Sequence, residues 1–398
     1  MLKRKYLAQV LLAISALASF GFVANLQATE VPPPLPVEPT GIIESLPSQY
    51  PPEWFLVQDS AFFHMSDGKV YVIDASKDTV AEQVKGMFNN ALMGNILQIP
   101  SRGEIASVET FHTRGTRGDR IDVLTFWDTA NLSPVGETLL PSGKRFMGMP
   151  ERVVLQTLNK DNWLAVFNFS PSTSITLIDL NQRSIMGEIA IPGCSFIYEN
   201  GDMGFSSLCA DGRLLTIELN ADGTEKSRQH SDVFFDSDDS PIFERPARVG
   251  DMAYFPTFDG KVHPVAMSGS AAQPMSPWSL VGAGEEGWAP SGIGLDGEDE
   301  LGRIYFLMNP EANGVDGMHN AGGAEIWIFD PDSRRRVQRI ALKEWGLSFA
   351  VSRGKEPKVL VTNPVDMSVE LYDGLSGEFI KKITGFGQET PLFLWGAQ

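Results

Sequence analysis

Short apolar runs that end in an acidic or small residue recur along the chain. Each run is followed by a polar turn and a second strand-like segment, the pattern of two antiparallel strands joined by a hairpin. The seven runs end at Asp74, Asp128, Asp179, Glu218, Ala266, Asp330 and Asp373. They span 373 − 74 = 299 residues in six steps, so the mean step is close to fifty residues.

Further apolar runs, such as WLAVFNFS and DMAYFPTF, lie between these phrases. Four strands per fifty residues is typical of a propeller blade. The nearest helical candidate, TVAEQVKGMFNNAL, fits a short helix or a strand pair. The pattern therefore predicts an all-β fold, a seven-bladed β-propeller over residues 51–398. A two-sheet sandwich array is the alternative, and the propeller is favoured because a closed ring lets blades cover one another's edges.

The first 28 residues have the layout of a secretory signal peptide. A basic start at Lys3, Arg4 and Lys5 precedes an apolar stretch and small residues at a cleavage position after Ala28. A membrane anchor is the alternative, but the stretch is alanine-rich and marginal in length for a span. We expect residues 1–28 to be removed and the protein to reach a bacterial periplasm.

A proline-rich segment follows, with TEVPPPLPVEPTG at residues 29–41. Such a composition favours an extended chain over a packed element. Residues 29–50 are therefore predicted to form an N-terminal arm that precedes the propeller.

Cys194 and Cys209 are the only two cysteines in the chain. In an oxidising compartment such a pair favours a disulfide over two separate thiols. Cys194 follows the third phrase and Cys209 precedes the fourth, so we expect the bond to pin the crossing between neighbouring blade segments.

The chain carries a formal net charge of −18, and removal of three signal-peptide cations makes this −18 − 3 = −21. Such an acidic excess argues against nucleic acid or an anionic membrane as a partner. The stretch RGTRGDR, with Arg114, Arg117 and Arg120, is interpreted as the one local cationic cluster. It fits a docking surface or a solvated loop equally well.

The sequence offers no catalytic constellation. None of the five histidines lies three to five residues from another, so no metal site is predicted. The GxGxxG spacing in GIGLDG lacks a preceding strand and is followed by three acidic residues, so it is interpreted as a loop. A large secreted propeller of this kind is often a scaffold or a binding platform.

Several stretches together resemble a known family. They are RGTRGDRIDVLTFWD, FNFSPSTSITLIDL, IPGC with CADGRL, YFPTFDGKVH and GWAPSG. In this order and spacing, the chain resembles the heavy (large) subunit of quinoprotein amine dehydrogenases, the methylamine and aromatic amine enzymes of the bacterial periplasm. The resemblance covers most of the mature chain and implies a seven-bladed propeller.

The resemblance also implies a division of labour. The cofactor, tryptophan tryptophylquinone, would belong to a small (light) subunit, and this chain would carry none and no catalytic residue. Two heavy and two light subunits would form a heterotetramer that oxidises a primary amine to an aldehyde and ammonia. An azurin- or amicyanin-type copper protein would accept the electrons.

One motif departs from the family. In methylamine enzymes a heavy-chain Phe in a stretch like GMxxGGF lies at the mouth of the substrate channel. Here the corresponding stretch is GMFNNAL, residues 86–92, with Leu92 at the Phe position. Leu92 is either part of a differently shaped gate or simply packs in a blade. The expected residues of the substrate channel and subunit interface are Phe88, Leu92, Arg114, Arg117 and Arg120. The alternative function is a stand-alone periplasmic propeller that binds a ligand or protein without redox chemistry.

Overall fold

The structure is a computed structural model that describes residues 45–60, 67–387 and 391–398. The predicted signal peptide and residues 29–44 of the predicted arm lie outside the described residues. The last residues of that arm lie against a turn at residues 129–131. The Leu46 amide donates a hydrogen bond to the Ala130 carbonyl at 2.8 Å, and the Tyr50 hydroxyl donates one to the Thr129 carbonyl at 2.6 Å.

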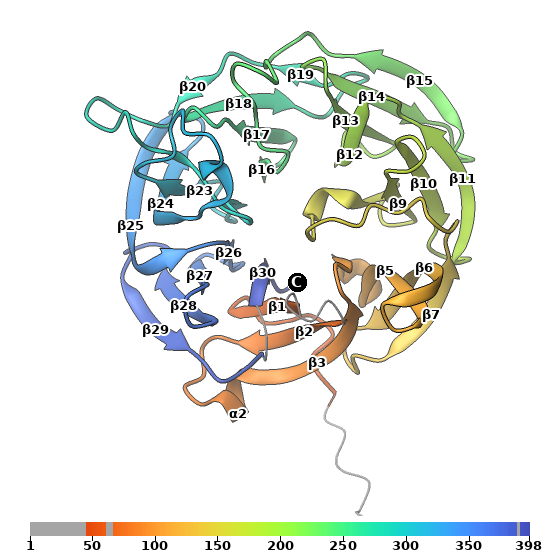
Figure 1. The fold of residues 1–398 in the computed structure, drawn as a ribbon, viewed down its shortest axis with the longest axis horizontal. Coiled ribbons are helices and arrows are strands. Elements are labelled where there is room, and N and C mark those ends of the chain that lie inside the picture. Colours follow the sequence, from red (N-terminus) through yellow and green to blue (C-terminus); the bar gives the residue numbers. More distant parts are fainter. Residues whose placement is uncertain (1–44, 61–66, 388–390) are drawn as a thin grey trace, which may run out of the picture. The chain divides into compact units, whose positions relative to one another are not determined.

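The strands form seven antiparallel sheets arranged around a ring (Figure 1), numbered here as blades one to seven. From the innermost to the outermost strand, blade one is β30 (Pro391–Gly396), β1 (Trp54–Ser60), β2 (Asp67–Asp74) and β3 (Val84–Ala91). Blade two is β4 (Asn95–Ile99), β5 (Glu104–Arg114), β6 (Arg117–Asp128) and β7 (Pro134–Leu139). Blade three is β8 (Leu155–Leu158), β9 (Trp163–Asn168), β10 (Ser174–Asp179) and β11 (Ser184–Ala190).

The remaining four blades follow the same inner-to-outer order. Blade four is β12 (Cys194–Glu199), β13 (Gly204–Cys209), β14 (Leu214–Leu219) and β15 (Glu225–His230). Blade five is β16 (Ala247–Val249), β17 (Met252–Pro256) and β18 (Lys261–Ala266), with β19 (Gln273–Pro274) and β20 (Trp278–Ser279) on β18. Blade six has β21 (Ala289–Pro290) and β22 (Asp296–Glu298) on β23 (Ile304–Asn309), then β24 (Gly323–Asp330) and β25 (Arg335–Gly346). Blade seven is β26 (Phe349–Val351), β27 (Lys358–Asn363), β28 (Ser368–Asp373) and β29 (Phe379–Ile383).

Blade one combines the first three described strands of the chain with its last strand. Its innermost strand, β30, pairs antiparallel with β1, with Phe55 opposite Gly396 and Gln58 opposite Phe393. The last strand in the sequence thereby closes the ring beside the first. The seven-bladed propeller is confirmed, and the sandwich alternative is wrong.

The seven recurring runs are the third strands of the seven blades. At five of them the terminal aspartate caps the turn to the outermost strand, because its Oδ1 accepts backbone N–H groups two or three residues later. These aspartates are Asp74, Asp128, Asp179, Asp330 and Asp373, with N···O distances of 2.7 to 3.2 Å. Asp side chains that hydrogen-bond the backbone two residues on are a standard device for tight turns. The repeat in the sequence is therefore a repeat of turn chemistry.

The hydrophobic core lies between neighbouring blades. The central strands are buried on both faces, as in β9 and β23, where all six residues are buried. One cluster joins blades two, three and four, and another joins blades five, six and seven. Continuous apolar runs replace strict alternation in these strands because each sheet is covered on both sides by its neighbours.

Helical structure is confined to short segments. The stretch TVAEQVKGMFNNAL forms the four-residue helix α2 (Val80–Gln83) followed directly by β3. Single 3-10 turns lie at η1 (Pro100–Arg102), η2 (Arg152–Val154) and η3 (Met318–Asn320). In the part of the chain that the structure describes, no helix has the length and apolar character needed to cross a membrane.

The antiparallel order assigns each loop to one of two faces of the ring. Connections from one blade to the next emerge at the same end of the sheets as the hairpins between second and third strands. We call this the connector face; in blades one to three it includes the turn at residues 92–94, the β5–β6 hairpin and the connection at residues 140–151. The loops between first and second strands lie on the opposite face.

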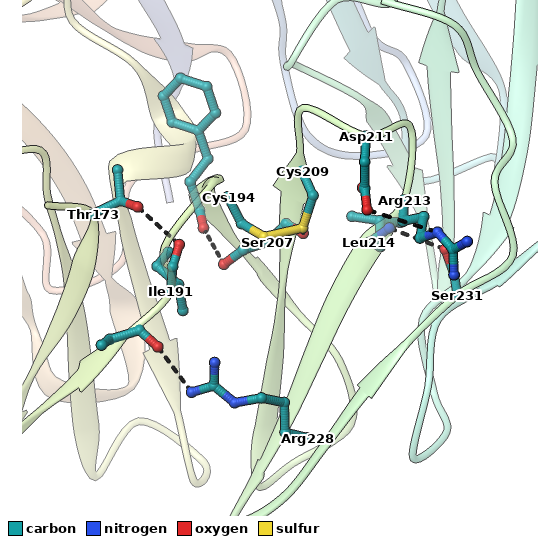
Figure 2. The surroundings of a disulfide bond; sticks show 12 residues. Thr173, Ile191, Cys194, Ser207, Cys209, Asp211, Arg213, Leu214, Arg228 and Ser231 are labelled. Atoms are coloured by element: carbon teal, nitrogen blue, oxygen red, sulfur yellow. Dashed lines mark hydrogen bonds and ion pairs between the residues drawn. A yellow bond between two sulfur atoms is a disulfide. The ribbon is translucent and has the colours of Figure 1, made fainter.

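The predicted disulfide between Cys194 and Cys209 is present (Figure 2). The two residues lie opposite each other in β12 and β13, so the bond joins two strands of blade four. The expected position between neighbouring blade segments is wrong, because the connection from blade three ends before Cys194. Hydrogen bonds link the blades there instead: the Arg228 guanidinium of blade four donates to the Ala190 carbonyl of blade three at 2.8 Å.

The disulfide makes a testable contribution to stability. Its two cysteines are 15 residues apart, and closing a loop of that size stabilises a fold by about 3 kcal/mol on the chain-entropy argument. We expect the C194A/C209A double variant to lose that much free energy of unfolding in urea titrations. Reductant should bring the unsubstituted protein to the same level and leave the variant unchanged. An unaltered unfolding curve after verified reduction would contradict this role.

Candidate functional site

The predicted interface residues lie on blades one and two. Leu92 is in the three-residue turn at 92–94, which joins β3 to β4. Arg114 and Arg117 are at the tip of the β5–β6 hairpin, where they lie opposite each other in register. Both segments are on the connector face, so Leu92 and the predicted cationic cluster lie on one side of the ring.

The Leu92 turn is held by hydrogen bonds to its backbone on both sides. The Ala91 amide donates to Glu109 Oε1 at 2.9 Å, and Gln58 Nε2 donates to the Gly94 carbonyl at 2.8 Å. The Arg145 guanidinium donates to the Met93 carbonyl. Met93 has a φ of 58°, in the left-handed region that non-glycine residues adopt at a cost. The turn therefore has a defined backbone conformation.

Phe88 does not reach the surface. Its side chain is 3% exposed, and its ring lies 4.8 Å from the Trp127 ring, centroid to centroid. It belongs to the core between blades one and two, together with Leu56 and Ile105. Leu92, by contrast, is partly exposed in its turn.

The three arginines of the cationic hairpin differ in environment. Arg114 and Arg117 are exposed, and no ion pair to either is found among the described residues. Arg120 is partly buried, and its Nε donates to Asp122 Oδ1 at 2.9 Å. Its Nη2 donates to the Arg145 carbonyl at 3.1 Å. Arg114 and Arg117 are therefore the two that remain available for a partner.

Exposed apolar side chains accompany this cationic hairpin on blades two and three. They belong to strand ends and loops of the connector face and are 40 to 70% exposed: Phe111, Ile121, Leu139, Met147 and Phe169. Phe169 also contacts Phe146 of the 140–151 connection, with ring centroids 6.0 Å apart. Exposed large apolar groups beside cations are typical of protein interaction surfaces.

Sequence reasoning missed the buried charges beneath this surface. Glu109, Asp122 and Arg145 are 1%, 1% and 4% exposed. Burial lowers the pKa of Arg145 to about 10, with Asp122 opposing that effect, and burial raises the pKa of Glu109. A signal was available, because Glu109 and Asp122 interrupt the apolar runs of β5 and β6. Charged residues at such positions are costly unless paired.

A second cationic group was also missed, so the prediction of a single cluster at residues 114–120 is wrong. β25 and the turn before it carry Arg334, Arg335, Arg336, Arg339 and Lys343. Two of these are held by Glu285, in the connection between blades five and six. Arg336 and Arg339 bond it at 2.7 and 3.0 Å, and both cover the Trp327 ring.

A cavity of about 560 Å³ opens at the centre of the ring on the face opposite the connectors. Innermost strands and adjoining loops of blades one, two, three, six and seven line it, including Arg152, Asp161, Glu298, Arg353 and Trp395. Its lining mixes carboxylates and guanidinium groups. No single ligand class is selected by that mixture.

Further charges are buried near the ring axis. Arg245 Nε lies 2.9 Å from Glu151 Oε2 and 3.0 Å from Glu244 Oε1. Burial raises the pKa of Glu151 to about 8, although the attraction of Arg245 opposes that rise. Asp296 is 4% exposed and has Arg152 at 4.0 Å.

Among the described residues, one group of metal-ligating side chains lies close together. Sγ of Cys194, Sγ of Cys209 and a ring nitrogen of His230 are within 4.8 Å of one another. The two sulfur atoms are bonded to each other in the disulfide, so neither is available as a thiolate ligand.

Comparison with known proteins identifies relatives along almost the whole propeller. The profile of a family described as methylamine dehydrogenase heavy chain matches residues 53–394. A methylamine dehydrogenase heavy chain of Methylophilus methylotrophus is 24% identical over 337 residues, covering 83% of this chain and 80% of that protein. The corresponding protein of Methylorubrum extorquens is 25% identical over 327 residues, covering 80% and 76%.

Solved structures agree with the fold at lower identity. A putative 6-phosphogluconolactonase of Bacteroides fragilis superposes with a TM-score of 0.57 at 12% identity, covering 89% of this chain and 98% of that one. A protein of unknown function from Desulfotomaculum acetoxidans gives a TM-score of 0.57 at 10% identity, covering 87% and 100%. These similarities support the propeller alone.

The buried Glu151 makes a prediction about pH. The folded chain keeps this carboxyl protonated up to about pH 8, whereas the unfolded chain releases the proton near the ordinary value of 4.5. Between these values the folded state binds more protons at this site, so the contribution of Glu151 to stability is fully present below pH 4.5 and is lost as pH rises through 8. We expect E151Q to flatten the fall seen in urea titrations between pH 5 and 9. E300Q, at an exposed carboxylate beside the axial cavity, should leave the slope unchanged, and equal slopes in all three proteins would contradict the assignment.

Proposed function

Because the chain belongs to the methylamine dehydrogenase heavy chain family, we propose that it is the heavy subunit of a periplasmic amine dehydrogenase that depends on tryptophan tryptophylquinone. The observation that carries the proposal is the family match over residues 53–394, nearly the entire propeller. The reaction would convert a primary amine and water to an aldehyde and ammonia, with release of two electrons and two protons.

The pair formed by Trp288 and Trp327 does not fit a quinone cofactor. The Trp288 and Trp327 rings are 5.0 Å apart, but Trp327 is fully buried and Arg336 covers it at 4.1 Å. A substrate amine has no access to that ring. In the proposed complex the quinone would belong to the light subunit, and it would supply the two-electron oxidation of the amine.

The connector face of blades one to three is the proposed docking surface for the light subunit. It combines the Leu92 turn, the exposed Arg114 and Arg117, and five exposed apolar side chains. Arginine and aromatic residues are enriched in protein interfaces, and exposed cations steer association with an acidic patch. Leu92 would then border the substrate channel. Phe88 supports the turn from within the core and does not contact the partner.

The rest of the proposal concerns the assembly and its surroundings. Two heavy and two light subunits form the complex, residues 1–28 direct export to the periplasm, and an azurin- or amicyanin-type copper protein takes the electrons. With Leu92 in place of an aromatic gate, the accepted amine need not be methylamine. One methylene in an apolar pocket is worth about 1 to 3 kcal/mol of discrimination, so the gate residue tunes amine size.

A second candidate is a stand-alone binding platform. The axial cavity of about 560 Å³ favours it, because that volume suits a small-molecule ligand. The two candidates differ in composition: the dehydrogenase requires a quinone-bearing light chain, whereas the platform is complete as one chain.

Native mass spectrometry of the protein from its own periplasm, without overexpression, distinguishes the two candidates. We expect the mass of two heavy and two light chains. The light chain should be lighter than its sequence mass by the hydrogens lost in quinone and disulfide formation. Detection of a lone chain would overturn the dehydrogenase and leave the binding platform.

Charge reversal at the hairpin tip tests the docking surface. We expect R114E/R117E to weaken assembly with the light subunit by about three- to tenfold at low salt, because exposed ion pairs contribute about 0.2 to 1 kcal/mol each. The difference should shrink in high salt as the charges are screened. The control is R334E/R335E, at exposed arginines on blade six, which should assemble normally. A loss of the same size in both double variants would argue against this surface.

A further inference from the structure

The buried charges beneath the Leu92 turn point to a residue that sets the shape of the channel mouth. We propose that Arg145 is a positioning residue that fixes the turn at residues 92–94 and thereby the place of Leu92. The inference rests on the proposed function insofar as Leu92 borders the substrate channel. The positioning itself concerns this chain alone.

Arg145 belongs to the connection between blades two and three, yet it reaches back to the connection between blades one and two. Its Nη2 donates to the Met93 carbonyl and, at 3.1 Å, to Asn95 Oδ1. Its Nη1 donates to Thr110 Oγ1 at 2.9 Å. One guanidinium therefore holds the turn, the start of β4 and the middle of β5 together.

Two buried carboxylates make the burial of this cation tolerable. Asp122 Oδ1 accepts the Thr110 hydroxyl at 2.6 Å, and Asp122 Oδ2 accepts the Gly143 amide at 2.7 Å. Glu109 accepts the Thr125 hydroxyl at 2.6 Å and the Ala91 amide at 2.9 Å. Asp122 thus holds the backbone just before Arg145, and Glu109 holds the backbone just before the Leu92 turn. Both carboxylates attract the positive charge of Arg145.

The same network extends to the cationic hairpin. Arg120 bonds Asp122 with its Nε and the Arg145 carbonyl with its Nη2. The Leu92 turn and the hairpin that bears Arg114 and Arg117 are therefore built on a common buried framework. A substitution of Arg145 should disturb the Leu92 turn more than it disturbs Arg114 and Arg117, because Arg145 contacts the turn directly.

The geometry calls for arginine rather than lysine. A planar guanidinium presents several donors in a fixed fork, whereas a lysine ammonium is a single point of charge. Met93 holds a left-handed backbone conformation, which costs free energy in a non-glycine residue. Without the hydrogen bond from Arg145, we expect the backbone at Met93 to relax out of that conformation. Loss of the bond to its carbonyl frees the turn, and with it the side chain of Leu92. A displaced Leu92 side chain at the channel mouth would change which amines fit, because small displacements alter how a substrate is positioned.

Hydrogen exchange tests the positioning without any need for activity. In the full heavy chain, with or without the light subunit bound, we expect R145Q to speed exchange of the peptide that spans residues 91–95 by about tenfold, because hydrogen bonds to charged groups are strong. R145K should exchange this peptide at a rate between those of the unsubstituted protein and R145Q. T110V removes one acceptor of Arg145 with little change in volume, so it remains informative if R145Q fails to fold.

R183Q is the matched control. Arg183 also bonds a carboxylate across blades, donating from Nη2 to Glu104 at 2.7 Å, but it lies on the opposite face. Exchange of residues 91–95 should be unchanged in R183Q. Equal exchange of this peptide in the unsubstituted complex, R145K and T110V would overturn the positioning role.

Kinetics test the consequence for the channel. With methylamine, n-butylamine and benzylamine as probes, we expect R145K and T110V to change the ratios of kcat/KM between amines by about threefold or more, whereas R183Q should preserve them. Faster exchange with unchanged ratios would overturn the link from Arg145 to selectivity. If the unsubstituted complex oxidises no primary amine, the proposed function fails, and the exchange measurement still decides the positioning role.

Discussion

Closure of the ring by β30 is the constraint on which the rest of the structure depends. A sheet edge exposes unpaired N–H and C=O groups, and each blade alone could not bury its two faces. Pairing of β30 with β1 joins the chain's last strand to its first described strand, and blade one then packs on blades two and seven. Only in the closed ring does every blade have a neighbour on both sides.

Within that ring, local turns and long-range packing have separate tasks. The recurring aspartates fix the turns that lead to the outermost strands through hydrogen bonds to nearby backbone amides. The apolar clusters between blades consist of buried side chains from adjacent blades, and burial of apolar surface is the main driving force of folding. The disulfide reinforces one blade but does not organise the ring.

The buried charges lie where packing alone would leave backbone groups unsatisfied. Beneath the Leu92 turn, Arg145 bonds the Met93 carbonyl inside the turn, and Glu109 bonds the amide of Ala91, the last residue of β3. Such networks are costly when incomplete and rigid when complete. The surface that we propose for subunit docking therefore lies over a buried network in which both Nη atoms of Arg145 are hydrogen-bonded and its Nε has no partner among the described residues. This arrangement suits a chain whose proposed task is to hold a catalytic partner.

The sequence by itself determined the number of blades, the third strand of each and the disulfide partners, because these depend on local patterns and on two cysteines. It also carried the cationic stretch with Arg114, Arg117 and Arg120, and the family resemblance that singled out Leu92. Only the tertiary structure placed Phe88 in the core, tied Arg120 to Asp122 and brought Arg145 to the Met93 carbonyl. Arg145 and Met93 are 52 positions apart, whereas Arg120 and Asp122 lie two positions apart in β6. A linear pattern does not reveal which partner neutralises a buried charge. Burial and pairing are properties of the closed ring, in which segments from separate blades meet.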